Sequence, residues 1–111
     1  MTAINRMAIT IVDGSQSKAL IHALNEHDFS VTLLDAVGGF MHESMETLVV
    51  GMNEARLTHF FTLVRRHCPS RTRYVSMGGE LALAPGYPMM IEARIGGATI
   101  FVLPVEQFVQ L

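Results

Sequence analysis

Cysteine and charged side chains are scarce in this sequence, and each shortage excludes some classes of protein. Cys68 is the only cysteine, so the chain cannot rely on an internal disulfide, as many small secreted domains do. No apolar run approaches the roughly 20 residues that a membrane-spanning helix needs. Residues 1–6 lack the apolar segment of a signal peptide. We therefore expect a cytoplasmic protein without a membrane span.

Basic residues are also few. The 111 residues include 8 lysines and arginines against 10 aspartates and glutamates, a formal net charge of −2. Arg65, Arg66, Arg71 and Arg73 form the one local concentration of positive charge. Proteins that bind long nucleic acids draw most of their affinity from neutralised phosphates. The sequence therefore does not predict a long nucleic acid as partner.

Apolar residues, in contrast, are in excess. The chain is 50% hydrophobic and 16% charged, with a mean hydropathy of +0.34. Its length is that of one domain, so we treat residues 1–111 as a single unit. A domain this small has a large surface, and few charges are available to cover it. Part of the apolar excess is therefore expected to be buried between subunits.

Alternating and apolar runs predict five strands, and helical periodicity predicts two helices. The first helix, residues 15–27, places Ala19, Leu20, Ala23 and Leu24 on one face, with Ser15 or Ser17 as its cap. The predicted strands cover residues 7–12, 30–37, 47–52, 89–95 and 98–103.

The second helix, residues 54–67, has the stronger amphipathic pattern. Leu57, Phe60, Phe61 and Val64 recur at helical spacing. Asn53 is a suitable cap before it, and Pro69 cannot continue it.

The loops carry their own signals. Residues 40–46 read as a loop between two strands, and residues 76–88 contain five glycines and prolines that predict an irregular segment. Gly96-Gly97 predicts a hairpin turn between the last two strands.

The order of these elements predicts the fold class. A β-α-β-β-α-β order with one extra C-terminal hairpin strand is typical of an α+β, ferredoxin-like domain. Two helices would cover one sheet face. The strands are apolar on both sides in places, for example at Ile9, Val49 and Ile100. The second face therefore also needs a cover, and partner subunits are the expected one.

Four glycine-containing segments resemble the cyclic-di-AMP receptor family of the PII-like signal-transduction proteins. They are Gly38-Gly39-Phe40, Val50-Gly51-Met52-Asn53, Met77-Gly78-Gly79 and the block of residues 96–105, GGATIFVLPV, which is the most specific. The resemblance spans nearly the whole chain. It implies a PII-like sandwich, a homotrimer, and cyclic di-AMP bound in clefts between subunits, with a signalling role and no enzyme activity.

The resemblance also implies a set of ligand-binding residues: Thr32, Gly39, Phe40, Met41, Gly51, Phe101 and Gln110. Phe40 would be a stacking platform for an adenine, and the glycines would let backbone groups approach a base. Three positions depart from the family pattern. Asp28, Ser30 and Met45 stand where the family usually has asparagine, arginine and asparagine. His42 could meet a phosphate when it is protonated.

The sequence predicts neither a catalytic centre nor a cofactor. His22 and His27 are five residues apart, and His59 and His67 are eight apart, spacings that do not bring two imidazoles to one metal on a helix. Cys68 lies at a helix end, where the carbonyls disfavour a thiolate.

Three functional hypotheses remain open. In the first, cyclic di-AMP enters a cleft between the second and third strands of one chain and the tail of its neighbour. It then orders residues 40–46 and 77–88 for an unidentified target protein. In the second, the three departures indicate a different ligand for the trimer, a less anionic nucleotide or a ligand that tolerates carboxylates, which would suit Asp28 and Glu43 better. In the third, the trimer is an interaction module without a small ligand.

Overall fold

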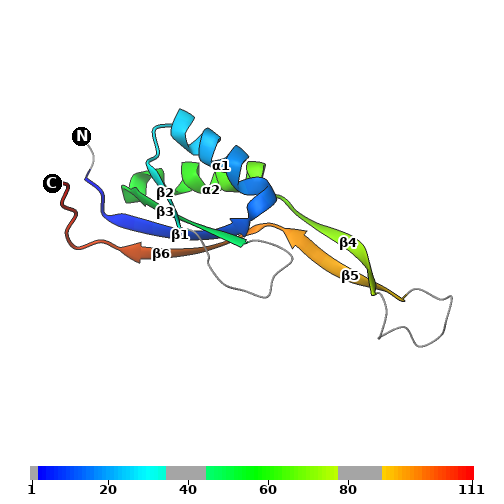
Figure 1. The fold of residues 1–111 in the computed structure, drawn as a ribbon. Helices are drawn as coiled ribbons and strands as arrows, with labels where there is room; N and C mark the ends of the chain where they lie inside the picture. The colour runs from blue at the N-terminus through cyan, green and yellow to red at the C-terminus, as the bar shows by residue number, and fades with distance from the viewer. Residues whose placement is uncertain (1–2, 35–44, 78–88) are drawn as a thin grey trace.

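The computed structural model describes residues 3–34, 45–77 and 89–111 (Figure 1). In chain order its elements are β1 (Arg6–Asp13), α1 (Gly14–Glu26), β2 (Val31–Leu34), β3 (Met45–Met52), the 3₁₀ turn η1 (Glu54–Arg56), α2 (Leu57–His67), β4 (Ser70–Met77), β5 (Met89–Gly96) and β6 (Ala98–Pro104).

The main sheet is antiparallel, with strand order β2-β3-β1-β6. Both helices lie on the same face of this sheet (Figure 1). This is the arrangement of a ferredoxin-like fold, and it confirms the predicted α+β class. Among the described residues, no helix is both long enough and apolar enough to cross a membrane.

The core lies between the sheet and the helices. Alternate residues of β1, namely Ala8, Thr10 and Val12, are buried on the helix side. Burying an aliphatic or aromatic side chain contributes roughly 1.5–3 kcal/mol, so this layer is the main source of stability. The helices contribute the buried side chains Leu20, Leu24, Phe60, Leu63 and Val64.

The predicted apolar faces of the helices are largely confirmed. Leu57 and Phe61 pack partly buried against the core, beside the buried Phe60 and Val64. In α1, however, Ala19 is exposed and Ser17 is buried instead. The Ser17 hydroxyl can be buried there because it donates to the Gly14 carbonyl at 3.1 Å.

The helix caps correct one prediction and confirm another. The cap of α1 is Asp13, and not Ser15 or Ser17. Its carboxylate accepts from the Ser15 N–H at 2.8 Å and from the Ser15 hydroxyl at 2.7 Å. Asn53 caps the next helical segment as predicted, because its side chain accepts from the Ala55 N–H at 3.0 Å.

The predicted Gly96-Gly97 hairpin is wrong. β5 pairs with β4, and β6 pairs with β1, so the two strands that flank the glycines are not partners. β4 was missed because its alternation of polar and apolar residues is weak. The pair β4–β5 forms an arm that projects away from the main sheet (Figure 1), and Gly96-Gly97 is the joint between arm and sheet.

The predicted limits of the middle strands need adjustment. β3 begins at Met45, so Met45 and Glu46 belong to a strand and not to the predicted loop. β2 is described over residues 31–34, and residues 35–37 of the predicted strand lie outside the described residues. The rest of the predicted loop, residues 40–44, and most of the irregular segment 76–88 lie outside the described residues.

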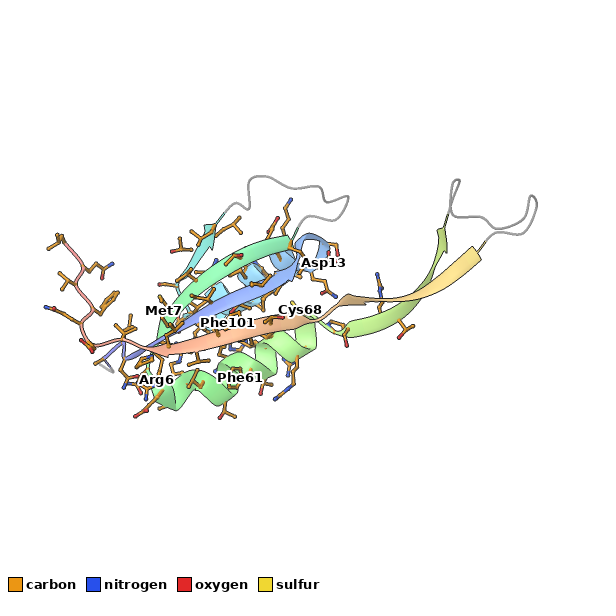
Figure 2. The ribbon with its side chains drawn as sticks, turned by 90° about the horizontal axis from the view of Figure 1, so that it is seen from below. Arg6, Met7, Asp13, Phe61, Cys68 and Phe101 are labelled. Atoms are coloured by element: carbon orange, nitrogen blue, oxygen red, sulfur yellow. The ribbon has the colours of Figure 1, made fainter. Side chains whose placement is uncertain are left out.

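The sheet face opposite the helices carries the other set of alternating residues. Met7, Ile9 and Ile11 of β1 lie on it, only half-buried, and Phe101 of β6 is paired with Ile9. Figure 2 shows the sheet from this side, with Met7 and Phe101 in view. We call it the open face, because no helix of the described chain covers it.

Candidate functional site

A pocket of about 520 Å³ lies at the end of the main sheet where the two termini meet. The strands contribute Ser30 (just before β2), Thr32, Val49 and Gly51, and β1 contributes Met7. The N-terminal segment contributes Ile4. The tail after β6 contributes Val105, Gln107, Phe108, Val109 and Gln110. Its volume is within the range of small-molecule sites, about 300–1,000 Å³.

The pocket brings together four of the residues singled out in the sequence. Thr32, Gly51 and Gln110 line it, and so does Ser30. Thr32 is paired across the strands with Val49, so both side chains lie on the open face. The sequence alone could not show that residues 30–51 and residue 110 share one cavity.

Gly51 lies in close contact with the N-terminal segment. A Cβ atom at this position would lie 3.2 Å from the Ile4 Cγ2 atom. Its φ is not in the left-handed region, so the requirement is close approach and not backbone freedom. A larger residue would push Ile4, which also lines the pocket.

Hydrogen bonds between the termini hold this end of the molecule together. The Val105 N–H donates to the Asn5 carbonyl at 3.0 Å, and the Asn5 N–H donates to the Met52 carbonyl at 3.1 Å. The Asn5 side chain accepts from the Glu54 N–H at 2.8 Å. Arg6 adds an ion pair to Glu54 at 2.9 Å. The base of the tail is therefore fixed beside β3.

Several predicted site residues do not line the pocket. Phe101 lies on the open face and is 55% exposed. Met45 lies at the opposite end of β3 and lines a second pocket. Gly39, Phe40, Met41 and His42 lie outside the described residues.

Asp28 also lies outside the pocket lining, and it has a structural role. It adopts a φ of +64° in the turn after α1, where aspartate and asparagine are tolerated better than most residues. Its carbonyl accepts from the Arg56 guanidinium at 3.3 Å. The same guanidinium lies 3.8 Å from the centre of the Phe29 ring, which ties the turn to η1.

Sequence reasoning missed most of the tail. Gln107, Phe108 and Val109 line the pocket together with Gln110, and the Phe108 ring is 52% exposed. The tail that lines the pocket belongs to the same chain, whereas a neighbour's tail was expected. Apolar residues in a tail outside any predicted element, Phe108 among them, were the available signal.

The second pocket, of about 470 Å³, lies at the base of the arm, near Ile11, Met45, Cys68 and Gly97. Cys68 is 4% exposed. Burial raises the pKa of its thiol to about 11, and the Asp13 carboxylate adds to the shift. The thiol therefore stays protonated at neutral pH and is a poor nucleophile.

The chemistry of the first pocket is that of a binding site. Its polar groups are the hydroxyls of Ser30 and Thr32 and the carboxamides of Gln107 and Gln110. These groups donate and accept hydrogen bonds but do not titrate near neutral pH. Within residues 3–34, 45–77 and 89–111, no group of three or more histidine, cysteine, aspartate or glutamate side chains could hold a metal ion.

The fold and the sequence of this chain are similar to those of known proteins. A solved protein of unknown function from Pediococcus pentosaceus ATCC 25745 has the same fold, with a TM-score of 0.71 and 25% sequence identity. The match covers 97% of this chain and 98% of the other. A family model described as "Cyclic-di-AMP receptor" matches residues 5–111. With nearly all of its length accounted for by that match, the chain belongs to the cyclic-di-AMP receptor family.

Proposed function

We propose that this protein binds cyclic di-AMP, or a related adenine nucleotide, in the pocket between β2, β3 and the tail. The observation that carries the proposal is the meeting of Ser30, Thr32 and Gly51 with Gln110 in one cavity. Ser30 and Thr32 are far from Gly51 and Gln110 in sequence. The family resemblance implies that Thr32, Gly51 and Gln110 bind the ligand, and Ser30 is one of the positions that depart from the family pattern. The role is that of a signalling receptor and not of an enzyme.

The open face supports the assembly of copies into a homotrimer. Half-buried Met7, Ile9 and Ile11 and the exposed Phe101 make this face apolar. An apolar sheet face left in water is unfavourable, and in most domains a second layer covers it. Burying this face against identical copies would also bring the pockets, which open at its end, close to subunit boundaries.

The signal would pass through the chain segments next to the pocket. Residues 35–44 directly connect β2 and β3, which are two walls of the site. A ligand bound there would bias the conformations of residues 40–46, and in an assembly also those of residues 77–88. A target protein that distinguishes the two states would then receive the signal.

Calorimetric titration of the purified protein with cyclic di-AMP tests the function. We expect saturable heat with about one ligand per chain. Absence of heat and of any thermal shift at millimolar ligand would refute nucleotide binding, and would favour a trimeric interaction module.

A further inference from the structure

The pocket assigned to the nucleotide contains no charged side chain among the residues that the structure describes. Its hydrogen-bonding groups are neutral hydroxyls and carboxamides, and the rest of its wall is apolar. Cyclic di-AMP, in contrast, carries two phosphodiester charges. The lining can therefore hydrogen-bond to the bases and to the phosphates, but it offers the phosphates no charge-assisted hydrogen bond.

The positions of the cations in the chain strengthen this contrast. All 8 lysines and arginines of the sequence lie within the described segments, and residues 35–44 and 78–88 contain none. The two nearest in sequence to the pocket walls are already engaged. Arg6 pairs with Glu54, and Arg56 contacts the Phe29 ring and the Asp28 carbonyl.

The remaining cations lie elsewhere in the fold. Arg71, Arg73 and Arg94 belong to β4 and β5. This arm leaves the body at one end of β6, and the tail leaves at the other (Figure 1). Arg65 lines the pocket at the base of the arm. Lys18 belongs to α1 and Arg66 to α2. None of the 8 lysines and arginines is among the described residues that line the pocket.

The tail supplies an aromatic ring and two carboxamides, which are groups that can bind a neutral purine. Among the described residues of the lining, Phe108 is the aromatic one, and its ring is half-exposed. An exposed aromatic ring stacks on any base, with a gain of about 1–3 kcal/mol. Gln107 and Gln110 each carry a donor and an acceptor, and a carboxamide can pair with the adenine N6 and N7 atoms.

We propose that this pocket recognises the neutral adenine base of its ligand, with Phe108 as stacking platform, and gains little from the phosphates. Its ligand class then includes uncharged adenine nucleosides as well as the cyclic dinucleotide. This inference rests on the proposed function, since it assumes that adenine ligands occupy the pocket.

Salt dependence and competition test the inference on the full-length wild-type protein. Cyclic di-AMP is titrated at about 50 and about 500 mM sodium chloride, a range over which the screening length falls severalfold. We expect its affinity to change by less than about twofold, and adenosine to displace it with an affinity within about tenfold. A larger loss of affinity with salt, or no displacement by adenosine, would overturn the inference.

Variants of the tail test the platform. Phe108→Ala should weaken both ligands by about tenfold or more, and Phe108→Tyr should keep the affinity because it keeps the ring. Leu111→Ala is the matched control, since Leu111 is an exposed tail residue that does not line the pocket. Unchanged affinity in Phe108→Ala would contradict the role of the ring.

A variant that adds a positive charge to the pocket gives a further test of the inference. Ser30→Arg should tighten cyclic di-AMP binding and make it salt-sensitive, while adenosine binding stays within about twofold of wild type. The same improvement for adenosine would contradict the inference.

If neither ligand binds the wild type at any salt concentration, the proposed function itself fails. If cyclic di-AMP binds with steep salt dependence and adenosine does not compete, only this inference fails.

Discussion

At the scale of single residues, Asp13 joins the end of β1 to the start of α1. Its carboxylate accepts both the backbone N–H and the hydroxyl of Ser15. These two hydrogen bonds, the hydroxyl first, lower the pKa of Asp13. A group with a lowered pKa stabilises the fold above its unfolded pKa, near 4, and loses this contribution as the pH falls further.

The first prediction concerns this cap. Asp13→Ala should lower the free energy of unfolding by about 1 kcal/mol at neutral pH, because it removes an N-cap. Asp13→Asn is the control, since asparagine caps equally well but does not titrate. Urea unfolding from about pH 7 to about pH 3 should show a steeper acid loss in wild type than in Asp13→Asn. Equal pH profiles for the two proteins would contradict the role of the carboxylate.

Residue types also explain how much of the site was predictable. The family resemblance implied Thr32, Gly51 and Gln110 as ligand-binding residues, and the structure brings them together. Phe108 and Gln107 were missed because the tail has no periodic pattern, so nothing local indicates where its side chains go. Asp28 was considered for the ligand site, whereas its positive φ gives it a role in a turn.

At the scale of elements, the arm depends on its glycine joint. Gly96 and Gly97 have φ values of +78° and +81°, which residues other than glycine rarely adopt. A Cβ atom on Gly96 would lie 2.4 Å from the Pro69 carbonyl oxygen, which accepts from the Gln16 side chain at 3.1 Å and from the Gly97 N–H at 3.3 Å. The joint therefore leaves no room for a side chain.

The second prediction follows from this crowding. Gly96→Ala should lower the free energy of unfolding by about 2 kcal/mol or more, because it adds a backbone clash to an unfavourable φ. Gly97→Ala should cost only about 1 kcal/mol, since its Cβ would meet the Ser70 Cβ at 3.1 Å and not a carbonyl. Urea midpoints of the two variants check the order. A Gly97→Ala variant less stable than Gly96→Ala would contradict it.

The same joint shows where sequence patterns are insufficient at this scale. Periodicity correctly predicted both helices and the strands of the main sheet, because these elements bury one regular face. It could not predict which strands pair, since Gly-Gly suits a hairpin and a joint equally. The pairing of β5 with β4 depends on contacts between distant segments.

At the scale of the whole molecule, the single chain is more extended than a compact domain. Its radius of gyration is 18.0 Å, whereas about 13 Å is typical of a domain of this length. The projecting arm and the open face both leave surface that a single copy does not bury. These features agree with the apolar excess of the sequence and support a symmetric assembly of identical chains.

The third prediction tests this assembly. Ile9 lies half-buried on β1, on the open face, so Ile9→Glu would place a charge in the proposed interface, where burial without a partner is costly. Sedimentation should give the mass of a trimer for wild type and of a monomer for Ile9→Glu. Thr58→Glu, on the exposed surface of α2, should remain trimeric. A monomeric wild type would refute the assembly.

The most direct measurement is calorimetric titration of cyclic di-AMP into a matched pair of β2 variants. Thr32→Tyr places a ring in the pocket, and tyrosine is well tolerated in strands. Leu33→Tyr is the control, because it places the same ring on the other side of β2, where Leu33 is already 45% exposed. The account predicts that Leu33→Tyr binds like wild type and that Thr32→Tyr loses about tenfold or more in affinity. Equal binding by both variants, or no binding by wild type, would contradict it.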